Sequence, residues 1–438
     1  MHHRRVSSAL AALLLLSTAL ALPALPRAGA DPFISLQEGT GTNLHPPIFA
    51  WGDEELAAGW NGIRSGSGTA EDPYLISGWT ILLEDRSAIA LVGTRAHVMI
   101  EDIDIVGGAD VGTLGTAGCY LHRGKPCPGF APVHLVDVEN VTVRRIQVDR
   151  GIPAIQVEDS RHVLLEDLTF TPDPVTGYVP LNAIVVEGGA SITLRRITFD
   201  RVLGYPLMVQ FTENLVLEDS ILKSGPNERQ DPRGGRGTYM RVYGAVNAVF
   251  QRNTFHMGGL ILDSDNVAPV IRDSLFEGGA YGVGGFTMDT LPVSDLVVCG
   301  NRFVNHDSLA LDLYGARLVG ARIHGNEFRD GAGALTLFHA KDLRFEDNLV
   351  TGAGWRGIRF EYGTSMVAHG NSFSGNAVAV AASPYVAAPL DFTGNWWGHA
   401  SGPSGHGPGE GDPIQDRGGK LVLSPVLEEA PELSVGCA

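Results

Sequence analysis

The chain has 438 residues, of which 18% are charged, and its formal net charge is −17. A protein this acidic repels nucleic acid and anionic membrane surfaces, and it repels uronate polymers unless a divalent cation bridges the two. The 56 glycines and the low charged fraction indicate many turns and little exposed helix. A mature chain of about 400 residues allows two or three compact domains or one elongated repeat.

Residues 1–30 have the composition of a secretory signal. The sequence HHRR gives a basic start, an apolar stretch follows at 8–22, and the motif AGA at 28–30 is a cleavage site. This apolar stretch is too short for a membrane anchor, and no later one is long enough to span a bilayer. Removing residues 1–30 takes away three arginines and no acid, which moves the net charge from −17 to −20. We expect a secreted or otherwise extracytoplasmic protein.

Four cysteines suit an oxidising compartment. Cys119 and Cys127 lie in the segment GCYLHRGKPCPG and are close enough in sequence to close a small loop, so we predict a disulfide between them. The alternative for this segment is a metal site that includes His122. Cys299 and Cys437 can pair or stay free, and the sequence does not decide between the two.

A frame of eight residues recurs along the chain, as in VTVRRIQV, VLLEDLTF, ITLRRITF and LVLEDSIL. With the second residue of the central pair as an anchor, the frame continues from Asp102 to Gly394, and most intervals between successive anchors fall in the low to middle twenties, which is typical of a solenoid. Within each frame apolar and polar residues alternate, and β-branched and aromatic residues are frequent, which predicts short strands. The sequence therefore predicts an all-β, single-stranded parallel β-helix of about twelve coils over residues 79–398, with caps at 31–78 and 399–438.

The charged pair at the centre of each frame alternates in sign. In chain order the pairs are Glu101-Asp102, Arg144-Arg145, Glu166-Asp167, Arg195-Arg196 and Glu218-Asp219. Residues stacked at the strand spacing of about 4.8 Å stabilise each other when their charges are opposite. We therefore predict that these pairs stack as a structural ladder and have no catalytic role.

Two further columns follow from the same register. The positions two before and three after the second charged residue are apolar, for example Leu165 and Phe170, so we expect them to face inward. The position directly after the second charged residue becomes polar along the chain, reading Ser220, Asn253, Ser274, Asn301, Asn326, Asn348, Asn371 and Asn395. Stacked asparagines can hydrogen-bond along a column and satisfy turn backbone, so we predict a structural asparagine ladder.

Three segments resemble a known group of proteins. GTAEDPYLISGWTI before the coils, the turns GNRF, GNEF and GNSF, and GNWWGHASGPSG near the end are similar to secreted right-handed parallel β-helix repeat proteins of the pectate-lyase-like superfamily. The resemblance is to the branch of the carbohydrate-binding and sugar-hydrolysis repeat and of the periplasmic accessory protein NosD. It covers nearly the whole mature chain and implies the fold, but that branch includes lyases, hydrolases, epimerases, adhesins and uncharacterised surface proteins.

The catalytic motifs of that superfamily are missing. Neither the carboxylate motifs of polygalacturonase-like hydrolases nor the Asp-Pro-His-Asp motif of alginate epimerases occurs in the chain. A pectate-lyase-like site needs a calcium cluster of acids and a base. The nearest candidates are the acids Asp263, Asp265, Asp289, Asp307, Asp312 and Glu361, with Arg241 and Arg359 as bases. Their spacing matches no motif, so ordinary solvated acids are the simpler interpretation.

One outward-facing column suggests a metal site. The residue before the second charged position reads Cys299, His324, Glu346 and His369 in four successive coils. Neighbours in such a column lie about 5 Å apart, and ligands of these types bind zinc or copper. The alternative is that this column merely tolerates polar residues.

Aromatic residues concentrate in the last coils and suggest a carbohydrate site. Trp355, Tyr362 and Trp396 offer flat surfaces on which sugar rings can stack, and Tyr385 lies in the same region. Trp397 falls in the inward column and is expected in the core.

These observations favour a noncatalytic secreted or cell-surface β-helix protein that binds a polysaccharide or a surface partner. The alternatives are a polysaccharide lyase or glycoside hydrolase, and a NosD-like periplasmic copper accessory protein. The favoured function requires no cofactor, whereas calcium, copper or zinc suits the alternatives. A monomer is the default expectation.

Overall fold

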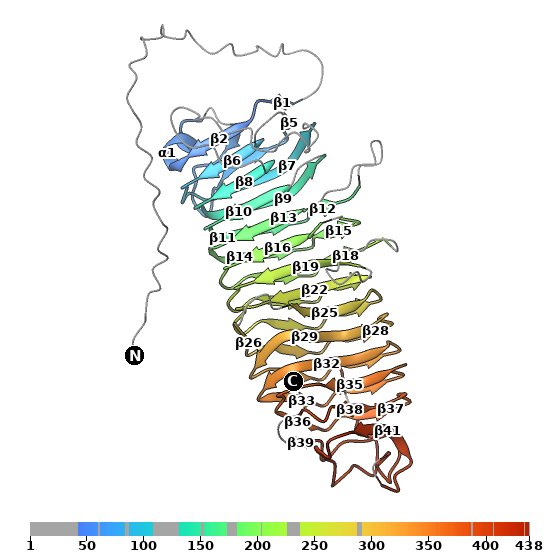
Figure 1. Ribbon diagram of the computed structural model, residues 1–438. Helices are drawn as coiled ribbons and strands as arrows, with labels where there is room; N and C mark the ends of the chain where they lie inside the picture. The colour runs from blue at the N-terminus through green and yellow to red at the C-terminus, as the bar shows by residue number, and fades with distance from the viewer. Residues whose placement is uncertain are drawn as a thin grey trace, which may run out of the picture. The chain divides into compact units, whose positions relative to one another are not determined.

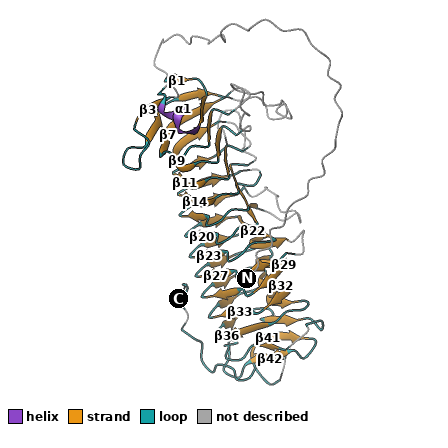
Figure 2. Ribbon diagram, turned by 90° about the vertical axis from the view of Figure 1, so that its left-hand side faces the viewer, coloured by secondary structure: helices purple, strands orange, loops and turns teal. Residues whose placement is uncertain are grey.

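Short β-strands make up nearly all of the regular structure, as the alternation of apolar and polar residues predicts (Figures 1 and 2). The computed structural model describes residues 43–59, 62–83, 87–107, 131–149, 153–172, 182–202, 204–225, 237–286, 291–386, 389–405, 407–432 and 434–437. The predicted signal at 1–30, Cys119, Cys127 and Asp289 lie outside these ranges. Within them the helix α1 (Gly52–Ala57) buries Leu56, and no helix has the length and apolar character that crossing a membrane requires.

The strands form three sheets. Sheet 1 contains β1 (Leu44–His45), β5 (Thr80–Leu82), β7 (Val98–Val106), β9 (Glu139–Val148), β11 (Arg161–Glu166), β14 (Ala190–Arg195), β17 (Val216–Glu218), β20 (Val249–Gln251), β23 (Val270–Arg272), β27 (Val297–Cys299), β30 (Arg322–His324), β33 (Leu343–Glu346), β36 (Met366–His369), β39 (Leu390–Asp391) and β42 (Leu421–Val422), and is joined by β3 (Ile63–Ser65) and β4 (Tyr74–Ser77). Sheet 2 contains β2 (Ile48–Trp51), β6 (Ile89–Val92), β8 (Val133–Val136), β10 (Ile155–Glu158), β13 (Ile184–Glu187), β16 (Leu207–Gln210), β19 (Thr238–Tyr243), β22 (Gly258–Asp263), β25 (Tyr281–Phe286), β26 (Val293–Ser294), β29 (Leu309–Val319), β32 (Gly333–Lys341), β35 (Arg356–Phe360), β38 (Val380–Ala382), β40 (Pro403–Ser404) and β41 (Gly411–Asp416). Sheet 3 contains β12 (Thr169–Phe170), β15 (Thr198–Asp200), β18 (Ile221–Lys223), β21 (Thr254–His256), β24 (Leu275–Glu277), β28 (Arg302–Val304), β31 (Glu327–Arg329), β34 (Leu349–Thr351) and β37 (Ser372–Ser374).

Coils in the middle of the helix pass once through each of the three sheets, and equivalent strands of successive coils pair in parallel. The coil β19–β20–β21 illustrates this, because its strands pair with β22, β23 and β24 of the next coil. Among the described residues, the antiparallel pairing is the one between β3 and β4 at the N-terminal end. The chain therefore has the predicted parallel β-helix fold.

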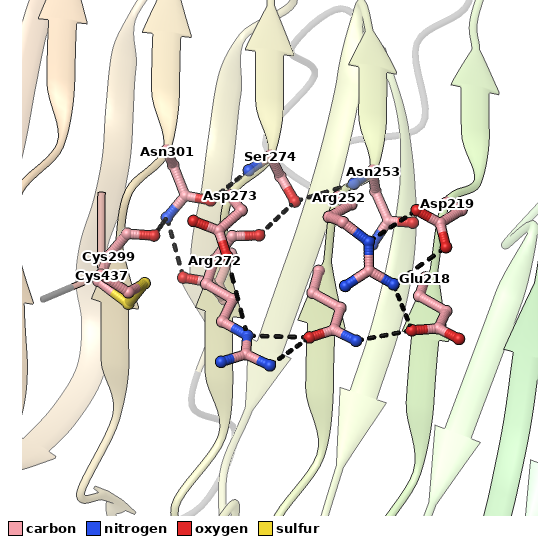
Figure 3. Close-up of polar contacts among 12 residues, drawn as sticks. Glu218, Asp219, Arg252, Asn253, Arg272, Asp273, Ser274, Cys299, Asn301 and Cys437 are labelled. Carbon is pink, nitrogen blue, oxygen red and sulfur yellow. Dashed lines mark hydrogen bonds and ion pairs between the residues drawn. A yellow bond between two sulfur atoms is a disulfide. The ribbon is translucent and has the colours of Figure 1, made fainter. Parts of the chain in front are cut away.

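The alternating charges form the predicted ladder on sheet 1. Strand register stacks the first members of the pairs in the order Glu101, Arg144, Glu166, Arg195 and Glu218. Arg144 donates to Glu101 at 2.6 Å and Arg195 donates to Glu166 at 2.6 Å. Farther along, Arg252 bridges Glu218 and Asp219 at 2.6 and 2.8 Å (Figure 3). The prediction of alternating vertical ion pairs is confirmed.

The second member of each pair occupies a turn that requires left-handed backbone. The φ angles of this column lie between 50° and 68° at Asp102, Arg145, Asp167, Arg196, Asp219, Arg252, Asp273, Gly300, Gly325, Asp347, Gly370 and Gly394. Most side chains adopt such angles only at a cost, whereas glycine does so freely. The change from charged residues to glycine along this column therefore keeps the turn unchanged while removing the side chain.

Aromatic side chains fill the interior next to sheet 3. Phe255, Phe276, Phe303 and Phe328 stack in successive coils with ring centroids 4.5, 4.8 and 5.0 Å apart. Trp397 ends this column and is fully buried. Burying each such ring contributes roughly 1.5–3 kcal/mol. The inward direction predicted for this column is confirmed.

Asparagines connect the turns between sheets 1 and 3. Asn326 is representative, since its Oδ1 accepts hydrogen bonds at 3.0 Å from both the backbone N and the Nδ2 of Asn301. Its Nδ2 donates to the carbonyl oxygen of Val298 at 2.8 Å and to Oδ1 of Asn348 at 3.0 Å. These side chains are buried, so each one satisfies polar groups that water does not reach.

The last residues return along the glycine turns. We call residues 423–432 and 434–437 the C-terminal strap. Its Leu427 N donates to the carbonyl oxygen of Asn395 at 3.0 Å, and Gly436 N donates to that of Gly325 at 3.1 Å. A disulfide joins Cys437 to Cys299 on β27, 138 residues earlier (Figure 3). The strap therefore spans the coils that lie between these two attachments.

The strap explains two of the glycines in the turn column. A Cβ atom at Gly325 would collide with the carbonyl oxygen of Gly436, and a Cβ atom at Gly300 would lie 3.1 Å from the backbone N of Cys437. The disulfide answers the question that the sequence left open, namely whether these two cysteines pair.

Candidate functional site

Exposed aromatic rings gather where sheet 2 approaches its C-terminal end. Side chains on this sheet alternate between the interior and the surface, so β35 buries Ile358 and Phe360 and turns Arg359 outward. We define the aromatic–arginine patch as Trp355, Arg356, Arg359, Glu361, Tyr362, Tyr385 and Arg417. The patch is assembled by β35, by the turn after β38 and by the residue after β41, because β38 pairs with both β35 and β41.

The rings of the patch are unusually accessible. Trp355, Tyr362 and Tyr385 have exposed fractions of 46%, 38% and 63%. The rings of Tyr362 and Tyr385 stack with centroids 5.0 Å apart and planes 12° from parallel, and Phe338 meets Tyr362 edge-on at 4.8 Å. The rings of Phe338, Tyr362 and Tyr385 support each other, so the two tyrosines present a preformed apolar surface to solvent.

Guanidinium groups flank this surface. The Arg356 guanidinium lies 4.3 Å from the centroid of the Trp355 ring, and that of Arg359 lies 5.3 Å from it. Arg359 forms an ion pair with Glu361. Burial lowers the pKa of Arg356, and the charges of Arg359 and Arg417 lower it further, whereas Glu361 opposes them. The patch is therefore locally cationic.

A second feature of sheet 2 lies at β19 and β22. Arg241 and Asp263 form an ion pair beside a depression of about 210 Å³, which is also lined by Met208, Gln210 and Tyr243. Asp263 is only 4% exposed, and its Oδ1 has no hydrogen-bond partner among the described residues. Burial raises the pKa of this carboxyl, and the Arg241 guanidinium opposes the rise.

The other candidate catalytic residues do not gather around this pair. Asp312 lies on β29, and its column continues through Thr336 to Arg359. Strand β25 separates Asp312 from the strand of Asp263. The described residues contain no group of three or more His, Cys, Asp or Glu side chains placed to hold a metal ion. Of the candidates that the sequence offered, Arg241 and Asp263 lie together at one depression. A catalytic role for any of these candidates stays a prediction.

The proposed metal column has the expected register but lacks its thiolate. Cys299 lies opposite His324, His324 opposite Glu346, and Glu346 opposite His369. The sulfur of Cys299 is bonded to Cys437, so it is not free to bind a metal. This bond corrects the expectation that Cys299 offers a ligand, and the remaining column carries no metal proposal.

The aromatic candidates differ in exposure. Trp355 and Tyr362 both belong to the patch, whereas Trp396 is half-buried. Sequence reasoning missed Arg356 and Arg417, which are 61 positions apart. Arg417 reaches the patch through the pairing of β41 with β38, and β41 lies in the C-terminal region where the repeat frame no longer applies. The sequence did contain a signal for Arg356, because this residue directly follows Trp355, which is a candidate for stacking on a sugar ring.

No family model matches the chain, and no curated protein matches it in sequence. Among solved structures, the A-module of the mannuronan C-5 epimerase AlgE6 from Azotobacter vinelandii is 13% identical, with 78% of this chain and 91% of that chain covered and a TM-score of 0.38. DFA-IIIase from Arthrobacter chlorophenolicus A6 without its lid is 14% identical, with 87% and 98% covered and a TM-score of 0.40. The surface adhesin PfbA of Streptococcus pneumoniae is 11% identical, with 80% and 84% covered and a TM-score of 0.35. Similarity at this level carries no information about activity or ligand.

Proposed function

We propose that this protein is a noncatalytic, extracytoplasmic β-helix protein that binds a glycan at the aromatic–arginine patch. The observation that carries the proposal is the stacked pair of accessible rings at Tyr362 and Tyr385, with the accessible ring of Trp355 at the other end of β35. The disulfide between Cys299 and Cys437 supports a location in an oxidising compartment. The partner is a polysaccharide in solution or on a surface, and the protein acts as a monomer.

The chemistry of the patch suits a sugar. The negative face of an aromatic ring attracts the C–H bonds on one side of a pyranose ring, so flat rings bind sugars without needing a deep cavity. The neighbouring Arg359–Glu361 pair offers both donors and acceptors to hydroxyl groups. A combination of apolar floor and a few polar groups that fix orientation is the usual composition of a small-molecule site.

We favour binding over hydrolysis because of the acids that line the depression beside Arg241 and Asp263. Glycoside hydrolases use two carboxyl groups about 5–10 Å apart. The described residues that line the depression beside Arg241 include one acid, Asp263. We therefore propose no reaction at this depression.

The proposal is tested by calorimetric titration of the mature protein with panels of neutral and acidic oligosaccharides. We expect Trp355→Ala and Tyr385→Ala to weaken binding at least tenfold, since each removes an accessible ring. Phe211→Ala is the matched control, because Phe211 is 54% exposed and lies after β16, far along the chain from the patch. Equal binding by all these variants, or no binding of any glycan by the wild type, would refute the proposal. Release of unsaturated or new reducing ends would replace it with an enzymatic function.

A further inference from the structure

An exposed phenylalanine on sheet 2 has a backbone conformation that its residue type disfavours. Phe211 directly follows β16 with a φ angle of 52°, and the equivalent residues of the two neighbouring coils are Gly188 and Gly244, with φ angles of 69° and 62°. A bulky residue with positive φ is an outlier, because only glycine adopts this conformation without steric cost. Such outliers cluster at functional sites. Glycine would suit this turn, so the presence of an aromatic ring needs another explanation.

The ring of Phe211 is held in a fixed orientation and is open to solvent. It is 54% exposed. It meets the Tyr243 ring edge-on, with the centroids 5.0 Å apart. It also lies over Gly244, where a Cβ atom would come within 2.7 Å of its Cδ1. The neighbours of Phe211 therefore position a ring whose surface remains available to a ligand.

Carboxylates without cationic partners lie on one side of this ring. A depression of about 240 Å³ is lined by Glu158, Asp159, Glu187, Gly188 and Phe211. Glu158 stacks directly on Glu187 in the register of β10 and β13, whereas the ladder of sheet 1 alternates acids with arginines. Glu158 contacts His134 at 2.9 Å, but Asp159 and Glu187 have no ion-pair partner among the described residues. Stacked like charges are destabilising, so this depression favours a bound cation.

The depression beside Arg241 and Asp263 lies on the other side of the ring. Strands β10, β13 and β16 carry the first depression and β16, β19 and β22 carry the second, so Phe211 lies between the two (Figure 1). The side chain of Asp263 is only 5% exposed, and its Oδ1 has no hydrogen-bond partner among the described residues. Arg241 neutralises the charge of this carboxylate. Together with Gln210 and Ser264, the pair offers donors and acceptors without net charge, which suits hydroxyl groups.

We propose that Phe211 and its two flanking depressions bind an oligosaccharide of amino sugars. The ammonium group of one sugar lies between the Phe211 ring and the carboxylates of Asp159 and Glu187, and the hydroxyl groups of another sugar occupy the depression beside Arg241 and Asp263. An aromatic ring attracts a cation to its face, and an ammonium group donates three hydrogen bonds that carboxylates can accept. A metal ion would gain little from the ring, and a second ammonium group would be repelled by Arg241.

The spacing of the depressions requires more than one sugar. Glu187 lies on β13 and Asp263 on β22, three strand spacings or about 14 Å apart along the sheet. The site is separate from the aromatic–arginine patch and does not rest on glycan binding there. Neutral and acidic oligosaccharides lack the ammonium group, so Phe211→Ala remains a control for the patch.

The test compares a hexamer of glucosamine with a hexamer of N-acetylglucosamine, which has the same backbone without the charge. Both are titrated calorimetrically into the mature protein at low salt and at a mildly acidic pH, at which the amino groups are protonated. We expect the glucosamine hexamer to bind at least tenfold more tightly than the acetylated hexamer and than spermidine, a polyamine without hydroxyl groups. Equal binding of the two hexamers refutes recognition of an ammonium group. Binding of spermidine as tight as that of the glucosamine hexamer refutes an amino sugar as the ligand.

Variants then connect the preference for the charged hexamer to this site. Phe211→Gly keeps the left-handed turn and removes the ring, and Glu187→Gln removes a carboxylate without changing the shape of the side chain. Each should reduce the preference to threefold or less. Glu71→Gln is the matched control, since Glu71 is an exposed acid near the N-terminal end without an ion-pair partner among the described residues, and its loss changes the net charge by the same amount.

Melting temperatures of all variants report whether each one is folded, and Glu187→Gln keeps the test valid if Phe211→Gly does not fold. A preference that survives in the folded site variants refutes the site, because the ammonium group would then be held elsewhere. A preference that falls equally in Glu71→Gln also refutes it, because the attraction would then come from the net charge of the protein alone.

Discussion

Removing the bond between Cys299 and Cys437 with Cys437→Ser should destabilise the C-terminal coils specifically. The bond closes a loop across a separation of 138 residues. In the chain-entropy description, a loop of this size stabilises the folded chain by about 5 kcal/mol, which is an upper estimate. A solenoid coil contacts only its neighbours, so a coil at the end can open without the rest. The loss should therefore concentrate in the coils beneath the strap.

Hydrogen exchange measured by mass spectrometry resolves this effect along the chain. Peptides within 320–375, beneath the strap, should exchange faster in Cys437→Ser by a large factor. Peptides within 190–250, upstream of β27, should exchange at nearly the wild-type rate. Reduction of the wild-type protein with a dithiol should reproduce the same pattern, which controls for the substitution itself.

Two results would contradict this reasoning. Equal acceleration of both regions would mean that the protein opens as one cooperative unit and that the strap has no local role. Unchanged exchange in both regions would mean that the hydrogen bond between Gly436 and Gly325 and the neighbouring strap contacts hold without the disulfide.

Further predictions concern the ladders and the turn column. Asn326→Ala leaves the buried backbone N of Asn301 and the carbonyl oxygen of Val298 without their partner. The substitution should lower the free energy of unfolding, measured with urea, by about 2–4 kcal/mol. A loss below about 1 kcal/mol would contradict this. Burial raises the pKa of Glu166, but Arg195 and Arg196 of the next coil lower it by more, so the net pKa is lowered. The ion pairs of Glu166 therefore stabilise the protein at neutral pH, and this stabilisation is lost as the pH falls through the lowered pKa. Glu166→Gln should therefore lower stability at pH 7 by about 1–3 kcal/mol, discounted for the partly exposed arginines, and should flatten the acid limb of the stability profile; an unchanged acid limb would refute the assignment. Gly325→Ala should destabilise the wild type by about 1–3 kcal/mol but destabilise it less in the Cys437→Ser background, where the strap can move away; equal costs in both backgrounds would argue against contact with Gly436.

The parts of the fold that repeat were predictable from the sequence. Glu166 and Arg195 carry opposite charges at equivalent positions, and a period in the twenties already implies that they stack. The same register predicts that Phe276 lies over Phe255. Each of these inferences needs only the distance between neighbouring coils, which is a property of every parallel β-sheet.

The parts outside the repeat were not predictable in this way. Cys437 lies in a segment without the frame, so the sequence contains no register that brings it to Cys299. The change from Asp273 to Gly300 in the turn column was visible, but no local pattern records the approach of the strap, which restricts the space at Gly300 and Gly325. Arg417 joins the patch through the pairing of β41 with β38 in the same irregular C-terminal region.

The strap also limits how this protein can change in length. From Asn395 to Cys299 it crosses four coil spacings, which amount to about 19 Å. The ten residue steps from Leu427 to Cys437 extend to about 33 Å at most. Duplication of up to two coils downstream of residue 299 leaves the cysteines within reach of each other, and a third breaks the connection. The described residues upstream of residue 299 contain no such tether, so whole coils can be inserted or deleted there without straining the strap.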